Sequence, residues 1–242
     1  MNKKPNKTIN WKYIIIAYIL AVLLSAPFNS FYFADFYQNL AEGTIFYKST
    51  FLPAGIGTLT AAFFALKYDK TLQIIIDFWG NNKLRNSVIS IIPLIVFTIT
   101  GIPNELHINT HLYALIISLV FFIYSMAEEI FWRGYLMNAF QSLGKIKSYL
   151  ILAFAWWIWH LPFFYPNGFW FFLFLVVGGS FLIGTFAEGT RSYLTTTALH
   201  SMMNIESNGG WTAPLLISGA AIIIIWIIID RLWKADVGIN KV

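Results

Sequence analysis

Long apolar segments alternate with short polar ones along most of this chain. The apolar segments predict helices that cross a membrane, although some fall short of the ~20 residues that a crossing needs. They cover residues 12–29, 50–67, 87–103, 112–137, 149–165, 169–187, 192–206 and 211–230. The pattern therefore predicts an all-α fold, a polytopic membrane bundle of about eight transmembrane helices.

Two segments depart from this simple pattern. The seventh contains Thr195-Thr196-Thr197 together with His200 and Asn204, which a membrane tolerates only when neighbouring helices bury them or they line a wet cavity. Residues 71–79 are apolar but too short to cross, so we expect an amphipathic segment along the cytoplasmic interface that ends at Gly80-Asn81-Asn82. Because the sequence shows no internal repeat or domain boundary, we treat residues 1–242 as a single domain.

The composition supports a membrane protein. Hydrophobic residues make up 58% of the chain and charged residues 11%, whereas a soluble domain has about 25% charged residues. The chain has no cysteine, which excludes disulfides, thiolate metal sites, iron–sulfur clusters and a cysteine nucleophile. Any catalysis must therefore use carboxylate, imidazole, hydroxyl or amide groups.

The basic residues indicate how the chain is oriented. The net charge is +5, but the lysines and arginines are spread over short loops instead of forming one stripe, so we expect no nucleic-acid partner. With the N-terminus inside, 15 of the 16 basic residues fall in inner segments and Lys48 alone falls outside. The apolar run after Lys3, Lys4, Lys7 and Lys12 does not end in the small-residue pattern of a signal-peptide cleavage site, so we expect it to stay as the first transmembrane helix. We predict a multi-pass cell-membrane protein with both termini cytoplasmic.

Charged and polar residues inside the predicted helices are the candidates for function. Glu128, Glu129 and Arg133 lie within an apolar run, where each charge costs roughly 2.5–3.5 kcal/mol at the bilayer centre. Glu129 and Arg133 are four residues apart, as are Trp156 and His160, and His200 and Asn204, so each pair shares a helical face. The two histidines lie roughly 15 Å from the cytoplasmic starts of their helices. We expect the three helices to meet at a buried, water-accessible pocket.

These residue types together favour hydrolysis of an amide bond. Two adjacent carboxylates in a low dielectric do not both ionise easily, so one stays a charged base while Arg133 fixes the other. A nearby histidine shares the proton of a bound water and makes it nucleophilic. His200 and Asn204 are suited to stabilise the oxyanion that forms.

The motifs resemble those of the CPBP family of intramembrane proteases, which includes CAAX prenyl endopeptidases and bacterial bacteriocin-immunity or abortive-infection proteins. The resemblance rests on Glu128-Glu129-x-x-x-Arg133, Trp156-x-x-x-His160 and His200-x-x-x-Asn204, in a motif core of about residues 125–206.

The resemblance implies that Glu128 and His160 activate water, that His200 and Asn204 stabilise the oxyanion, and that Glu129 and Arg133 hold Glu128. One residue departs from the pattern, because the family usually carries Phe where this chain has Trp156. Tryptophan keeps the aromatic surface and adds volume and an N–H donor.

Each motif taken alone also has a structural interpretation. The Glu129–Arg133 pair is often merely structural, a lone His160 is commonly a core residue, and His200 with Asn204 can join helices by hydrogen bonds. Glu128, His160 and His200 would also make a three-ligand zinc site, although the chain lacks the His-Glu-x-x-His signature. We favour a mechanism without a cofactor and keep zinc as the alternative.

The leading hypothesis is an endopeptidase that cleaves a peptide or membrane-protein substrate near the cytoplasmic side, in bacteriocin processing or self-immunity. One alternative is a non-catalytic immunity or scaffold protein that binds a partner. Another is a small transporter with a proton relay, which fits poorly with the absence of a repeat. The richness in Ile, Asn and Lys suggests a bacterial membrane, and lipid is an expected partner. The sequence selects neither a substrate nor an oligomeric state.

Overall fold

The computed structural model describes residues 8–29, 33–47, 49, 51–161 and 169–239. Within these ranges the chain is helical and contains no named strand, which confirms the predicted all-α class. The α-helices are α1 (Trp11–Asn29), α2 (Ala34–Ala41), α3 (Gly55–Tyr68), α4 (Lys83–Thr100), α5 (Thr110–Glu129), α6 (Lys145–Trp159), α7 (Phe169–Thr190), α8 (Tyr193–Asn208) and α9 (Ala213–Ile239). Two short 3-10 helices, η2 (Leu52–Ala54) and η4 (Gln141–Leu143), and the π-helix η3 (Ile130–Met137) lie between them.

The helices follow the predicted segments closely. Each of the eight apolar segments contains one helix, and α2 is a short additional helix in the connection between the first two segments. Among the described residues, five helical stretches are long and apolar enough to cross a membrane: α1, α4, α5 with η3, α7 and residues 213–233. The chain is a membrane protein, while the number of eight crossings stays a prediction. Residues 162–165 of the fifth segment lie outside the described residues, as do Lys3, Lys4, Lys7, Lys48 and Lys241.

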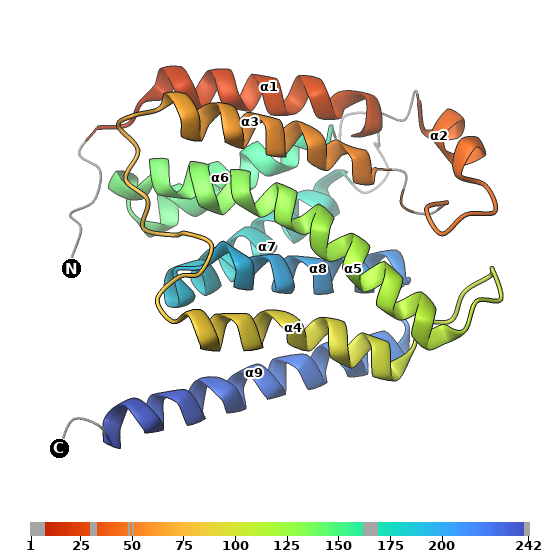
Figure 1. Ribbon diagram of the computed structural model, residues 1–242. Helices are drawn as coiled ribbons and strands as arrows, with labels where there is room; N and C mark the ends of the chain where they lie inside the picture. The colour runs from red at the N-terminus through yellow and green to blue at the C-terminus, as the bar shows by residue number, and fades with distance from the viewer. Residues whose placement is uncertain (1–7, 30–32, 48, 50, 162–168, 240–242) are drawn as a thin grey trace.

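The helices form a bundle with α5 at its centre (Figure 1). Helices α1 and α3 lie side by side on one flank, and α4 and α9 lie on the opposite flank. Helix α5 crosses obliquely between the flanks and packs most extensively against α8, while α6 packs against α7. The two helices that carry the first and third motifs are therefore direct neighbours in the interior.

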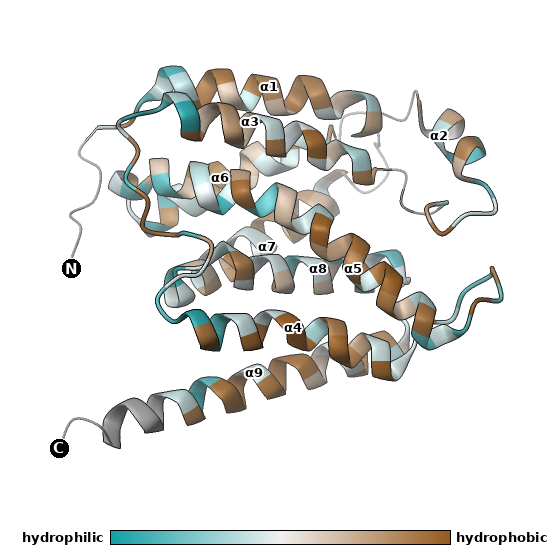
Figure 2. Ribbon diagram, viewed as in Figure 1, coloured by the Kyte–Doolittle hydropathy of each residue, from teal (hydrophilic) through white to brown (hydrophobic). Residues whose placement is uncertain are grey.

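The flanking helices are rich in hydrophobic residues, which are brown in Figure 2. Helix α1 exposes Ile15, Ile19 and Leu23, and α9 exposes Ile224 and Ile228. Apolar surface of this extent is costly in water but is well solvated by lipid tails. The flanking helices are thus suited to face the hydrocarbon of a bilayer.

The two ends of the bundle differ in charge. One end, which we name the basic end, holds the connections after α3, η3 and α7, the N-terminal end of α1 and the C-terminal end of α9 (Figure 1). Its basic residues include Lys67, Lys70, Lys83, Arg85, Lys145, Lys147 and Arg191. The other end, which we name the distal end, holds α2 and the connections 101–109 and 209–212. The predicted orientation would place the basic end in the cytoplasm.

The connection between α3 and α4 (residues 69–82) contains the short apolar segment for which we expected amphipathic structure. It forms no helix and is held extended instead. The Asp77 N–H donates to the Arg191 carbonyl at 3.0 Å, and the Tyr193 N–H donates to the Asp77 carbonyl at 2.9 Å. The Asn138 side chain accepts from the Ile76 N–H at 3.0 Å and donates to the Ile76 carbonyl at 2.8 Å. These bonds tie the connection to η3 and to the start of α8.

Gly80 makes this attachment sterically feasible. Its φ is +71°, and a Cβ there would lie 2.7 Å from the Ser192 Cβ and still closer to the Thr190 carbonyl oxygen. The Asn81 N–H donates to that same Thr190 carbonyl at 2.9 Å. Any residue with a side chain at position 80 would therefore push the connection away from α8.

Candidate functional site

The first motif lies where α5 changes into η3. Glu128, Glu129 and Arg133 are all buried, with exposed fractions of 1%, 0% and 1%. Arg133 donates from its terminal nitrogen to Glu129 Oε1 at 2.7 Å, across one helical turn. The structure thus joins this carboxylate and guanidinium as an ion pair inside an otherwise apolar bundle.

The helix does not continue unchanged through this motif. We expected one helix over 112–137, but α5 ends at Glu129 and the next eight residues form the π-helix η3. The Asn138 side chain donates to the Gly134 carbonyl at 2.8 Å and so occupies a backbone acceptor within η3. Single stretches of π-helix inside α-helices are frequent at functional sites.

Two tryptophans fix the Glu128 carboxylate. Trp132 and Trp156 both donate from their indole nitrogens to Glu128 Oε2, at 3.2 and 3.0 Å. The phenol of Tyr124 faces the same carboxylate. Because two donors from different helices converge on one oxygen, the carboxylate is held in one orientation.

The geometry at His160 defines which ring nitrogen is basic. Its Nδ1 lies 2.8 Å from the carbonyl oxygen of Trp156. A carbonyl only accepts, so Nδ1 carries a proton and Nε2 is the basic atom of the neutral ring. The ring packs edge-on against Trp159 and Phe172, with centroids 4.8 and 5.0 Å away, and it interacts electrostatically with Glu128.

His160 lies farther from the basic end than expected. Helix α6 begins at Lys145, and His160 is the residue that caps its C-terminus. At 1.5 Å per residue the histidine is roughly 22 Å from the basic end, compared with the expected ~15 Å. His200 differs in the opposite direction, because α8 begins at Tyr193 and places this histidine roughly 10 Å from the basic end.

Glu129 connects the first motif to the third. His200 Nδ1 lies 2.9 Å from Glu129 Oε1, the oxygen that also accepts from Arg133. His200 is 3% exposed, so the carboxylate, guanidinium and imidazole form one buried cluster. Within the described chain, Glu129 Oε2 and Arg133 Nε are buried without a hydrogen-bond partner. Each such atom costs about 1–3 kcal/mol, so stability alone does not explain the cluster.

Trp156 lies at the centre of the site and contacts all three motifs. Its ring centroid is 5.7 Å from that of His160 and 5.1 Å from that of His200. Arg133 Cζ lies 5.3 Å from the same ring, and the indole nitrogen donates to Glu128 as described above. The N–H that distinguishes this tryptophan from phenylalanine is thus used in the site.

Asn204 lies one turn beyond His200 on α8 and is half-buried. Its amide nitrogen donates to Ser125 Oγ at 3.1 Å, which joins α8 to α5 a second time. An amide nitrogen carries two hydrogens, so one remains for a ligand. The contact that holds Asn204 is therefore with Ser125, separate from the cluster at Glu129.

The motif analysis missed three residues that hold the candidate site. Tyr124 and Trp132 lie four residues before and after Glu128, so their spacing was a signal that they share its helical face. Ser125 has the same spacing from Glu129, but its partner Asn204 is on another helix. Only tertiary structure reveals that second contact.

Glu128, His160 and His200, the three possible zinc ligands, are not arranged as a zinc site. Among the described residues, no three His, Asp or Glu side chains come together closely enough to hold a metal ion. Glu128 is bonded to two indoles, and His200 directs Nδ1 at Glu129 rather than at a shared centre. We therefore derive no catalytic step through zinc.

Comparison with known proteins identifies one family. A model described as type II CAAX prenyl endopeptidase Rce1-like matches residues 109–205. The matched segment runs from the start of α5 into α8 and includes every candidate site residue named above. No curated protein and no solved structure matches the chain.

Proposed function

We propose that this chain is an endopeptidase that hydrolyses a peptide bond within the membrane, because residues 109–205 match the Rce1-like family model. The family match supports an intramembrane protease as the kind of function. The reaction steps and the roles of individual residues below are our proposal. The substrate is a peptide or a membrane-protein segment, and processing of a bacteriocin or self-immunity is the context that the family resemblance suggests.

Glu128 and His160 activate the attacking water. The indole donors orient the Glu128 carboxylate, and the backbone bond at Nδ1 leaves His160 Nε2 as a base. The water loses a proton to this pair as its oxygen attacks the peptide carbonyl carbon. When the C–N bond breaks, the proton passes to the departing amine, and a carboxylic acid and an amine are released.

His200 and Asn204 stabilise the oxyanion of the tetrahedral intermediate. The His200 Nε2 donates a hydrogen bond only when the ring carries both protons, because Nδ1–H is already bonded to Glu129. The Glu129 carboxylate accepts from Nδ1–H and so orients the ring, and Arg133 holds the carboxylate in place. Glu129 and Arg133 are therefore positioning residues in this proposal.

One observation carries the proposal: Glu128, Arg133, His160 and His200, which come from three helical segments, all contact Trp156. Independent structural roles for these polar residues would not require them to gather around one side chain. A shared reaction centre does require it, because water activation and oxyanion stabilisation act on the same peptide bond.

The test is cleavage of a fluorogenic peptide panel by the protein purified in detergent. We expect the wild type to cleave and Glu128→Gln to be inactive, while Glu188→Gln, a half-exposed carboxylate at the basic end, keeps full activity. Equal activity of Glu128→Gln and the wild type would overturn the proposal. Activity that a chelator abolishes and stoichiometric zinc restores would establish the zinc mechanism in its place.

A further inference from the structure

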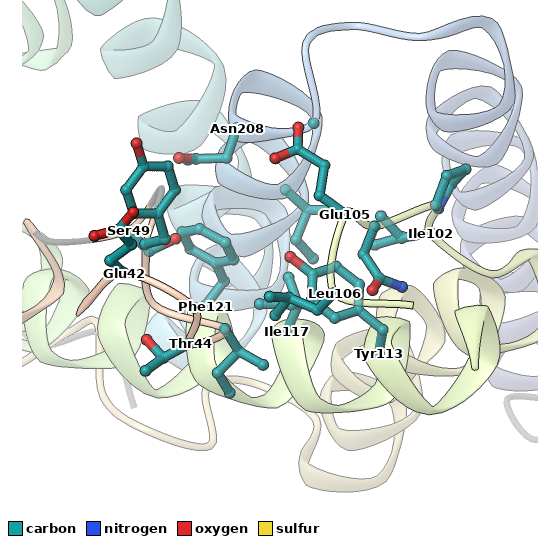
Figure 3. Close-up of a pocket in the computed structure, with 17 residues that line it drawn as sticks. Glu42, Thr44, Ser49, Ile102, Glu105, Leu106, Tyr113, Ile117, Phe121 and Asn208 are labelled. Carbon is teal, nitrogen blue, oxygen red and sulfur yellow. The ribbon is translucent and has the colours of Figure 1, made fainter. Parts of the chain in front are cut away.

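A large cavity lies at the distal end of the bundle (Figure 3). Its volume is about 700 Å³, which is within the range of small-molecule and peptide subsites. Side chains from four parts of the chain surround it: α5 with Tyr113, Ile117 and Phe121, the connection around residues 42–47 with Ser49, the connection 102–106, and the C-terminal end of α8. None of the residues assigned to the proposed reaction lines this cavity.

The floor of the cavity is apolar and buried. Ile102, Ile117, Phe121 and Ile205 line it, with exposed fractions of 1–6%. The packed floor is therefore suited to receive a short apolar side chain from a ligand. The space lies against α5 and α8, the two helices that also carry Glu128 and His200.

The floor lies close to the candidate site. Phe121 precedes Ser125 by one turn of α5, and Asn208 follows Asn204 by one turn of α8. The Asn208 side chain donates to the Asn204 carbonyl at 2.9 Å, and Asn204 donates to Ser125. One turn is about 5.4 Å, so the floor and the Ser125–Asn204 pair are separated by less than the length of two extended residues.

The rim of the cavity is acidic. Glu42 and Glu105 are exposed side chains on its two connections, and Asn104, Thr44 and Asn208 add uncharged polar groups. Among the described residues that line it, none is lysine, arginine or histidine. This charge contrasts with the basic end of the bundle, so an opening here favours cationic groups over anionic ones.

We propose that this cavity binds a peptide segment in which lysine or arginine is adjacent to an apolar residue. The cation lies at the glutamate rim, the apolar side chain fills the floor, and the chain extends from there toward Asn204. The inference rests on the proposed function in one respect, namely that the bound segment belongs to the substrate.

Binding can be measured separately from cleavage. The full chain with Glu128→Gln, held in lipid nanodiscs, is titrated against a fluorescein-labelled peptide that joins a lysine pair to a short leucine-rich segment. Matched peptides carry glutamine or glutamate in place of the lysines. We expect the lysine peptide to bind about fivefold or more tightly than the glutamine peptide, and the glutamate peptide to bind most weakly. The preference should shrink when salt is raised from about 50 mM to about 500 mM.

The rim variants identify the site. Glu42→Gln and Glu105→Gln should each weaken binding of the lysine peptide by about two- to fivefold and leave the glutamine peptide unchanged. Glu188→Gln is the matched control at the basic end and should change neither. Equal binding of the lysine and glutamine peptides, or no effect of either rim variant, would overturn the inference.

A cleavage assay with Glu128 intact separates this inference from the proposed function. Charge-selective binding without cleavage would support the cavity as a binding site and contradict the protease. Cleavage that is indifferent to lysine would support the protease and contradict the cavity as its substrate site.

Discussion

Glu129→Gln removes the charge that Arg133 and His200 share without changing the shape of the side chain. Arg133 is 1% exposed and its only carboxylate contact in the described structure is Glu129, at 2.7 Å. A buried charge that loses its partner costs about 3–5 kcal/mol. We therefore expect the free energy of unfolding to fall by roughly that amount.

The same change should slow the reaction. A neutral amide still fits beside His200 Nδ1 but no longer stabilises the charged ring. Hydrogen bonds to charged groups contribute about 1.5–3 kcal/mol, which corresponds to a roughly 10- to 150-fold loss of turnover. Because the loss arises in the transition state, kcat should fall while KM stays nearly constant.

The double variant Glu129→Gln/Arg133→Met separates the two effects. Methionine approximates the volume of the arginine stem and carries no charge, so most of the lost stability should return. Turnover should stay low, because His200 still lacks its carboxylate. Denaturant unfolding in detergent and peptide cleavage are the two assays.

Two results would refute this reasoning. If the double variant is no more stable than Glu129→Gln, the cost does not come from an unpaired arginine. If the double variant regains full turnover, Glu129 acts only by neutralising Arg133, and the His200 contact has no role in the reaction.

Further predictions concern the proposed catalytic residues, Trp156 and the topology. His160→Ala and His200→Ala should each lower turnover at least about 100-fold while leaving the unfolding transition cooperative, as a peptide assay with parallel unfolding would show. Trp156→Phe should lower turnover by about tenfold at most, since Trp132 still donates to Glu128. The double variant Trp132→Phe/Trp156→Phe should lower turnover further. Trp226→Phe is the matched control, because it loses an indole hydrogen bond to the Ile89 carbonyl far from the site. Because the chain has no cysteine, Lys70→Cys and Asn104→Cys report on opposite ends of the bundle, and an impermeant thiol reagent added to whole cells should label only the second.

The helices were predictable because apolar segments are driven into lipid, where every backbone N–H and C=O must be hydrogen-bonded and few structures other than a helix achieve this. Each predicted apolar segment contains one helix, and the four-residue spacing of Glu129 and Arg133 corresponds to a direct contact. The same local rule explains the bond from Trp132 to Glu128. These contacts depend only on neighbours within one turn.

Features that depend on distant residues were not predictable from the sequence. The connection 69–82 is held extended by Asn138 and by the backbone around residue 191, which its own apolar pattern does not reveal. The pairing of Glu129 with His200 likewise joins groups on two different helices. Helix α6 begins at Lys145, four residues before its predicted start at residue 149, because the polar residues there give no apolar signal.

The attachment of the α3–α4 connection has a mechanical consequence for the bundle. Its hydrogen bonds tie η3 and the start of α8 together at the basic end, and two further contacts, His200 with Glu129 and Asn204 with Ser125, join α8 to α5. The cavity lies beyond these contacts, so a small rotation of α8 relative to α5 produces its largest displacement at the mouth of the cavity. Thermal motion should therefore separate the helices more at the distal end than at the basic end. The amide hydrogens around residues 75–77 should exchange with solvent more slowly than those of most other connections.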